Sequence, residues 1–235
     1  MITEKALQDQ FTRLPAWRLG AFASIAFPGA GLVLPLAIFL PPFYTKTLGL
    51  GLAEVGLVFM LVRMFDIVTD PVMGMVGDRF GSRWGRRRHW LVIALPFMML
   101  GVFMAFMPSI DAADGPTVWY LGFWLVVLYT GSTMMTISHT AWGAELSPDY
   151  NERSRIASFN AFAGFAGSLM ILLPLALLEY RGAPPAGRDA LAFFGTAVLI
   201  LAPLCILLAV TLVKERPTAP APRINLLEGL GAVLK

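Results

Sequence analysis

The sequence has little charge and almost no cysteine. Only 14% of its 235 residues are charged, against about 25% in a typical soluble domain, whereas 57% are hydrophobic. These proportions exclude an ordinary soluble globular protein. The single cysteine, Cys205, lies in an apolar run, so no disulfide framework within the chain is expected.

Patterns typical of catalytic and nucleic-acid sites are also missing. The sequence contains no phosphate-binding loop, metal-ligand cluster or nucleophile triad, so we expect neither an enzyme nor a resident cofactor. Its most basic loop lacks interleaved aromatic residues, which argues against a nucleic-acid partner. The first apolar run is too long for a signal-peptide core, so no cleavable signal peptide is expected.

Long apolar runs dominate the chain instead. A hydrocarbon core about 30 Å thick requires roughly 20 apolar residues per helix. We therefore predict an all-α membrane protein with a six-helix bundle over residues 19–213. The expected helices are about 19–44, 52–77, 89–108, 116–143, 156–179 and 190–213. The first should be kinked or locally unwound, because it contains Pro28, Gly29, Gly31 and Pro35.

Basic residues between these runs predict the orientation. Fourteen of the 18 Lys and Arg residues fall on one side of the expected membrane, and only Lys46, Arg181 and Arg188 fall on the other. The positive-inside rule places the larger group in the cytoplasm. We therefore expect an integral protein of a bacterial inner (plasma) membrane with both termini cytoplasmic. Residues 1–18 form the N-terminus, and residues 214–235 form a linker ending in the start of a short amphipathic helix.

Two acidic residues inside the second run are the most informative ones. Asp66 and Asp70 are four residues apart and therefore share one helical face. Arg63, three residues before Asp66, joins the same face. A carboxylate near mid-membrane costs roughly 2.5–3.5 kcal/mol, and such residues by default mark an ion or solute pathway. We expect this face to line protein or water rather than lipid.

The sequence leaves two interpretations of this acidic face open. Arg63 could neutralise one aspartate within a packing network, but a single arginine cannot balance two aspartates, so one negative charge awaits a cation. Pro71 also leaves the carbonyl of Ile67 without its helical donor. Carboxylates, carbonyls and hydroxyls are the ligands that sodium accepts, whereas a proton needs only one carboxylate. The coupling ion is therefore expected to be sodium or a proton.

Several motifs resemble one family of transporters. The second run and its loop contain Asp66-x-x-x-Asp70-Pro-x-x-Gly74 and Asp78-Arg-x-Gly81, followed by Arg86-Arg-Arg88. A second stretch reads Ala141-Trp-Gly-Ala-Glu-Leu146. These motifs resemble the glycoside–pentoside–hexuronide:cation symporters, the melibiose permease-like branch of the major facilitator superfamily. The resemblance implies that the six helices form the N-terminal half of a twelve-helix fold, built from two inverted three-helix repeats.

The resemblance also implies roles for individual residues. The implied cation site consists of Asp66, Asp70, Thr133 and Thr136, with sodium at Asp66 and Asp70; Arg63 belongs to its charge network. The implied cytoplasmic gate consists of Gly74, Asp78, Arg79, Gly81, Arg86, Arg87, Arg88, Glu145 and Arg153. The residues near the family's solute-binding positions are Ser138, His139, Thr140, Trp142 and Asn160.

Two features of the fourth and fifth runs allow more than one interpretation. His139 is either a proton relay or a histidine bonded to a backbone carbonyl. Gly164 and Gly167, with nearby alanines, give the fifth run a smooth face that suits close helix packing or a sliding gate surface.

The expected function is solute symport by alternating access, coupled to sodium or protons. The solute is a sugar or an amphipathic molecule, because the family's sugar-binding charges are absent near Ala30 and Asn160. Besides the solute and the lipid bilayer, the expected partner is a C-terminal six-helix half or a second copy of this chain acting as a homodimer. The alternative is a non-transporting membrane scaffold or sensor that retains the fold.

Overall fold

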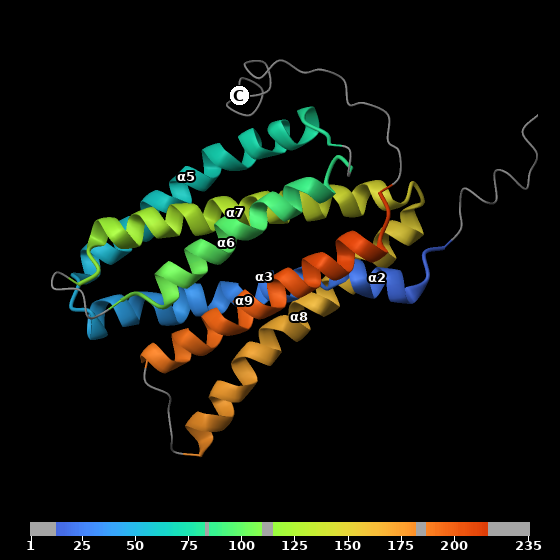
Figure 1. Ribbon diagram of the computed structural model, residues 1–235. Coiled ribbons are helices and arrows are strands. Elements are labelled where there is room, and N and C mark those ends of the chain that lie inside the picture. The colour runs from blue at the N-terminus through green and yellow to red at the C-terminus, as the bar shows by residue number, and fades with distance from the viewer. Residues whose placement is uncertain (1–12, 83–84, 110–114, 182–186, 216–235) are drawn as a thin grey trace, which may run out of the picture.

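The computed structural model describes residues 13–82, 85–109, 115–181 and 187–215, and its regular structure in these ranges is helical apart from an isolated bridge between Ser82 and Gly85. The long helices are α5 (Leu52–Arg79), α6 (Arg88–Phe106), α7 (Val118–Leu146), α8 (Tyr150–Tyr180) and α9 (Gly187–Leu212). They form an elongated bundle with the segment before α5 (Figure 1). Residues 1–12 of the expected N-terminus and 216–235 of the expected linker lie outside the described residues.

A helix, or a run of helical segments, lies in each of the six ranges expected from the apolar runs. Among the described residues, five of these are long and apolar enough to cross a membrane: Ala16–Thr47, Arg88–Phe106, Val118–Leu146, Tyr150–Pro174 and Gly187–Leu212. The sixth, α5, has 28 residues and is about 42 Å long at 1.5 Å per residue. Each of its 18-residue stretches holds at least three charged residues, so a six-span count is not established and the crossing by α5 stays a prediction.

The first helical run is irregular, as its prolines and glycines predict. It consists of α2 (Ala16–Ala23), α3 (Ala26–Leu34), α4 (Leu40–Pro42) and two π-helical turns, η1 (Pro35–Phe39) and η2 (Phe43–Thr47). Pro35 cannot donate to the carbonyl one turn earlier, and the backbone widens at that residue. A second break separates α2 from α3, where the hydroxyl of Ser24 donates to the carbonyls of Ala21 (2.8 Å) and Cys205 (3.3 Å).

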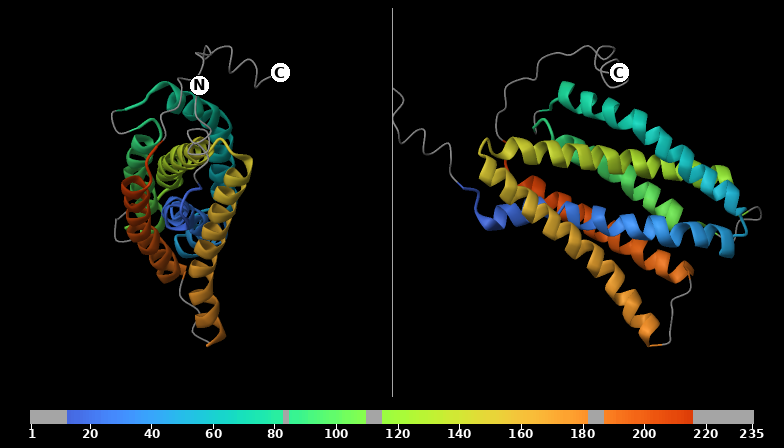
Figure 2. Two further views of the ribbon diagram at one scale, coloured as in Figure 1. Left: turned by 90° about the vertical axis from the view of Figure 1, so that its right-hand side faces the viewer. Right: turned by 180° about the vertical axis from the view of Figure 1, so that it is seen from behind.

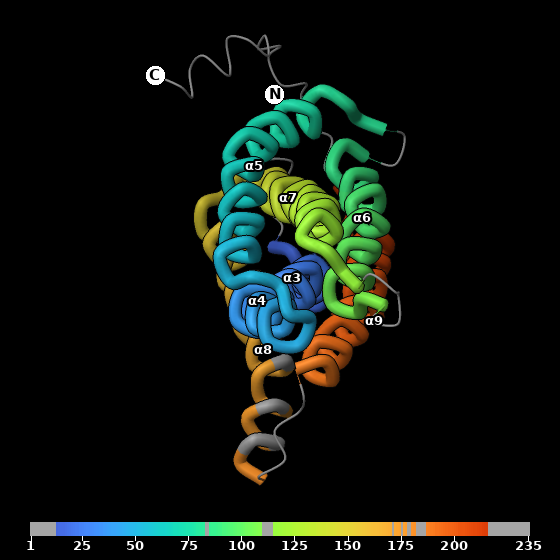
Figure 3. The backbone as a smooth tube through the Cα atoms, turned by 90° about the vertical axis from the view of Figure 1, so that its left-hand side faces the viewer, coloured from blue at the N-terminus to red at the C-terminus, as the bar shows by residue number. Residues whose placement is uncertain are grey.

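Helices α3 and α7 occupy the centre of the bundle, with α5, α6, α8 and α9 around them (Figures 2 and 3). Two glycines allow the closest approaches: Gly131 of α7 lies against the backbone of Met98 in α6, and Gly167 of α8 lies against the backbone of Phe27 in α3. A Cβ atom at either glycine would collide with that backbone. The close packing predicted for α8 is therefore confirmed at Gly167.

Candidate functional site

A cavity of about 620 Å³ lies between α3, α5, α7 and α8. Asp66 and Asp70 reach it from α5, and Thr133 and Thr136 reach it from α7. The structure therefore brings all four expected cation ligands to one cavity. Arg63 lines the same cavity, because residues 63, 66 and 70 follow one face of α5.

The carboxyl group of Asp66 is buried and only partly paired. The residue is 9% exposed, and its Oδ2 atom lies 3.6 Å from Nη1 of Arg63. Its Oδ1 atom is buried and has no hydrogen-bond partner among the described residues. Among the described residues, Arg63 forms an ion pair with Asp66 but not with Asp70. The Asp70 residue is exposed. The pairing with Arg63 therefore leaves acceptor capacity for a positive group.

Arg63 is divided between two neighbours. Its guanidinium carbon lies 4.6 Å from the centroid of the Tyr129 ring, and its side chain is 63% exposed. The distance of 3.6 Å to Asp66 is longer than a normal charge-assisted hydrogen bond. The packing-network interpretation thus accounts for one aspartate only, and for that one incompletely.

Two further polar groups at the cavity lack partners. The hydroxyl of Ser132 and the Oδ1 atom of Asn160 are buried, have no hydrogen-bond partner among the described residues, and belong to residues that line the cavity. Buried polar atoms are normally paired. Unpaired atoms from α7 and α8 at one cavity are therefore free to bind a polar ligand or water.

The expected solute-binding residues divide into two groups. His139, Thr140 and Asn160 line the cavity, whereas Ser138 and Trp142 do not. Trp142 is fully buried, with its ring edge-on to Phe22 at a centroid distance of 5.3 Å, and Ser138 is also buried. Residues 138 and 142 share a face that points away from that of Thr136 and Thr140, because two residues correspond to about 200° around a helix. Trp142 is therefore a core residue that does not line this cavity.

His139 bonds to a backbone carbonyl, as one of its two interpretations predicts. Its Nε2 atom donates to the carbonyl of Phe22 over 3.1 Å, and its ring lies 4.4 Å from that of Phe22. Phe22 is next to the last residue of α2, so this bond pairs a carbonyl at the break before α3. The contact gives His139 a structural reason to be buried at the edge of the cavity.

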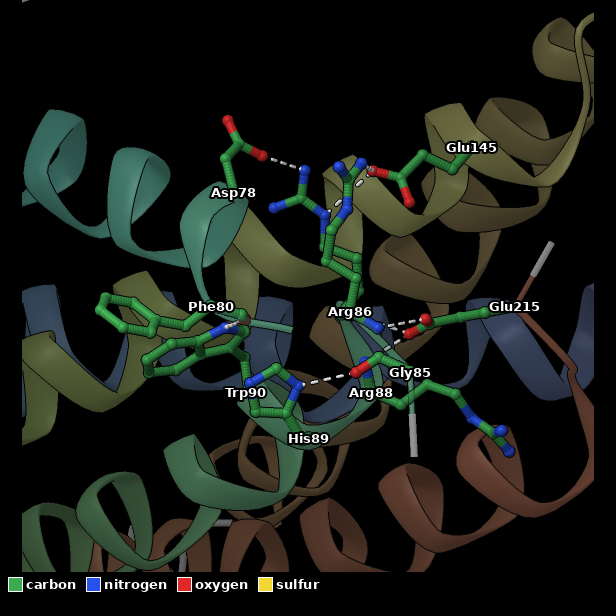
Figure 4. Close-up of polar contacts among 10 residues, drawn as sticks. Asp78, Phe80, Gly85, Arg86, Arg88, His89, Trp90, Glu145 and Glu215 are labelled. Atoms are coloured by element: carbon green, nitrogen blue, oxygen red, sulfur yellow. Dashed lines mark hydrogen bonds and ion pairs between the residues drawn. The ribbon is translucent and has the colours of Figure 1, made fainter. Parts of the chain in front are cut away.

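Ion pairs join the ends of α5 and α7 to the loop before α6 (Figure 4). Arg87 contacts Asp78 at the end of α5, and its Nε atom donates to Glu145 of α7 over 3.0 Å. Arg86 contacts the same oxygen of Glu145 at 2.5 Å. Four of the expected gate residues thus form one cluster, which we call the arginine cluster: Asp78, Arg86, Arg87 and Glu145.

The other expected gate residues lie outside the arginine cluster. Arg79 is exposed, and Arg153 donates from Nε to the carbonyl of Ser147 over 2.8 Å. The guanidinium carbon of Arg88 lies 6.0 Å from the Trp142 ring centroid. A Cβ atom added at Gly74 would meet open space, and one added at Gly81 would lie in van der Waals contact with Arg86. The arginine cluster therefore contains four of the nine residues expected to form the gate.

Two acidic residues that the motif comparison did not assign to a site make contacts on the same side of the bundle. The carboxylate of Glu215 accepts the backbone N–H groups of Arg86, Arg87 and Arg88 at 2.6, 2.8 and 2.5 Å. The buried carboxylate of Glu152 accepts the N–H of Leu14 over 3.0 Å. The only sequence signal at Glu215 is a charged residue two positions after an apolar run, and this signal does not indicate a partner.

Comparisons with known proteins agree with the motifs. Residues 21–235 match the sequence profile described as MFS/sugar transport protein. The putative glycoside/cation symporter YagG of Escherichia coli (strain K12) is 30% identical over 168 residues, which are 69% of this chain and 36% of that protein. The inner membrane symporter YicJ of the same organism is 28% identical over 193 residues, which are 80% of this chain and 41% of that protein.

A solved structure shows the same fold. The proton:xylose symporter XylE, bound to 6-bromo-6-deoxy-D-glucose, aligns with a TM-score of 0.61 over 85% of this chain and 45% of that chain, at 17% identity. The matched segments cover 36–45% of the lengths of these three proteins, so this chain spans less than half of each of them.

The family predicted from the motifs is confirmed by these comparisons. The apolar helices of this chain and its relatives identify it as an integral membrane protein of a non-enzymatic family. Because the profile matches all but the first 20 residues, this chain belongs to the MFS/sugar transport protein family, in the symporter branch that its acidic second helix resembles.

Proposed function

We propose that this chain is the N-terminal half of a symporter that couples the movement of a sodium ion or a proton to that of a small solute by alternating access. The observation that carries the proposal is the buried carboxyl group of Asp66, which has one unpaired oxygen at the 620 Å³ cavity. A buried, incompletely paired charge is costly and is retained where it has a function.

The proposed cation site lies between α5 and α7. A cation between Asp66 and Asp70 would balance the negative charge that Arg63 leaves, and the hydroxyls of Thr133 and Thr136 are oxygen ligands from the facing helix. Coupling requires that this cation bind one conformation more tightly than another. Neutralising the acidic face of α5 provides this difference in affinity if that face contacts water in one conformation and packed protein in the other.

The proposed solute binds in the same cavity. A volume of about 620 Å³ is within the usual range of about 300–1,000 Å³ for small-molecule sites. Ser132, Thr140 and Asn160 offer hydroxyl and amide groups that can pair with sugar hydroxyls. A glycoside-type solute is favoured by these groups and by the similarity to YagG, a putative glycoside/cation symporter. A binding assay distinguishes it from the alternative, an amphipathic solute.

A second six-helix body completes the proposed transporter. The relatives are more than twice as long as the segments they share with this chain, which supports a C-terminal half over a second copy of this chain. The arginine cluster would act as the cytoplasmic gate in a bacterial inner membrane, with both termini on that side. The ion pairs of Arg87 with Asp78 and Glu145 connect three chain segments there, so these pairs can break and re-form together.

Uptake by the complete transporter in proteoliposomes tests the proposal. Solute accumulation should follow an imposed sodium gradient or pH gradient, and D66N and D70N should remove that dependence. The matched control is E54Q, which neutralises an exposed carboxylate in the first turn of the same helix. Wild-type vesicles that accumulate no solute under either gradient would support a scaffold or sensor instead.

A further inference from the structure

We infer that Glu215 is a positioning residue for the arginine cluster, through which the end of α9 sets the placement of Arg86 and Arg87. The contact itself is independent of the proposed function, whereas its effect on transport rests on the proposed gate. Figure 4 shows the Glu215 carboxylate directed at the loop that precedes α6.

Glu215 holds the backbone of this loop through three consecutive amides. The N–H groups of Arg86, Arg87 and Arg88 donate to its two oxygens at 2.5–2.8 Å. Helix α6 begins at Arg88, so these include N–H groups that have no partner within the helix. A carboxylate at this end is also favoured by the helix dipole. A residue from the far end of the described chain thus performs the task of a local capping side chain.

The loop is shaped around this carboxylate. Gly85 has φ of 126°, and a Cβ atom at Gly85 would overlap the carboxyl group of Glu215. Only glycine adopts this conformation readily. Gly85 therefore combines the backbone turn with the space that Glu215 occupies.

Glu215 and Glu145 hold the same two residues in different ways. Glu145 accepts from the side chains of Arg86 and Arg87, at 2.5 and 3.0 Å. Glu215 accepts from their backbone N–H groups, and among the described residues it forms no ion pair with an arginine side chain. Glu215 therefore fixes the backbone positions from which these side chains extend, and it does not compete with Glu145 for their guanidinium groups.

The packed end of α9 holds Glu215 in place. Two residues earlier, Val213 is buried and donates its N–H to the carbonyl of Ala209 over 2.9 Å, which extends the end of α9. Since α9 also packs along α6, a displacement of the α9 end moves Glu215 and, with it, the loop that carries Arg86 and Arg87. This geometry couples the α9 end to the arginine cluster.

Amide hydrogen exchange in the complete transporter tests the contact directly. Peptides covering residues 86–88 should exchange about tenfold faster in E215A, because hydrogen bonds to a charged acceptor are lost. E215Q, which keeps one acceptor oxygen, should lie between E215A and wild type. The matched control K214A changes the adjacent exposed residue and should leave these peptides unchanged. Unchanged exchange in both Glu215 variants would overturn the inference.

Uptake measured on the same variants tests the effect on the gate. E215A should lower the rate of gradient-driven uptake while the half-saturating cation concentration stays at the wild-type value. Faster exchange with wild-type uptake would overturn the positioning role. If uptake by the wild type did not depend on a cation gradient, the proposed function would be contradicted. The hydrogen-exchange measurement would then decide whether Glu215 positions the loop. If E215A fails to fold, E215Q supplies both measurements.

Discussion

The Nη1 atom of Arg63 lies 3.6 Å from Oδ2 of Asp66, one helical turn away, while Oδ1 of the same carboxyl group is buried without a partner among the described residues. Arginine often neutralises an aspartate by donating to both carboxylate oxygens in a bidentate pair. The arrangement instead leaves Asp66 in part available, with Asp70 beside it at the cavity.

Replacing Arg63 by Gln should strengthen cation binding. The change removes the positive charge nearest to Asp66 and retains a polar side chain. The Arg63 side chain is largely exposed, so solvent screening limits the effect to roughly a three- to tenfold fall in the half-saturating cation concentration. The measurement is cation-stimulated uptake or binding at constant ionic strength. A rise in that concentration would show that Arg63 helps to build the site.

Replacing Thr133 by Ala should separate sodium from proton coupling. A sodium ion loses an oxygen ligand in T133A, so its half-saturating concentration should rise by about tenfold, and T133S should restore it. The control T130A removes a hydroxyl that donates to the carbonyl of Val126 over 2.7 Å and is not among the residues lining the cavity. Equal sodium dependence in T133A and wild type would favour the proton.

Asn160 and Trp142 should respond differently to substitution. N160A removes an amide whose Oδ1 atom has no partner among the described residues, and it should raise the half-saturating solute concentration roughly three- to tenfold. W142F alters a fully buried core residue and should lower the thermal stability without changing that concentration. Solute titration and thermal unfolding in detergent measure both effects. A loss of solute affinity in W142F would return Trp142 to the pocket.

Replacing Gly131 by Ala should destabilise the bundle. Its new Cβ atom would meet the backbone of Met98, which cannot move aside as a flexible side chain does. The expected loss is about 1–3 kcal/mol of the free energy of unfolding. The control G20A lies in helix α2 with open space around the new atom and should be neutral or slightly stabilising. Unfolding at increasing denaturant compares the two variants.

Local patterns explain which parts of the molecule the sequence predicts. The ranges of the helices follow from the lengths of apolar runs, and the shared face of Asp66 and Asp70 follows from their spacing of four. Helical geometry alone predicts that face, whereas Thr133 and Thr136 are predicted from the resemblance to the symporter family. All four residues line the cavity.

The remaining contacts depend on tertiary structure. A long helix such as α7 has several buried faces, so spacing alone does not show that Thr140 meets the cavity while Trp142 meets Phe22. The family resemblance assigns Arg153 to the gate, and the sequence does not show that this side chain bonds to the nearby Ser147 carbonyl. Glu215 contacts a residue 127 positions away, and no local periodicity links the two.

The dependence of solute affinity on the cation tests the central claim most directly. The dissociation constant of the solute is measured on the purified, complete transporter with and without sodium, and across pH, for wild type, D66N, D70N and the control E54Q. The account predicts that the cation tightens solute binding in wild type and E54Q and has no effect in D66N and D70N. Full cation stimulation of solute binding in both aspartate variants would contradict it.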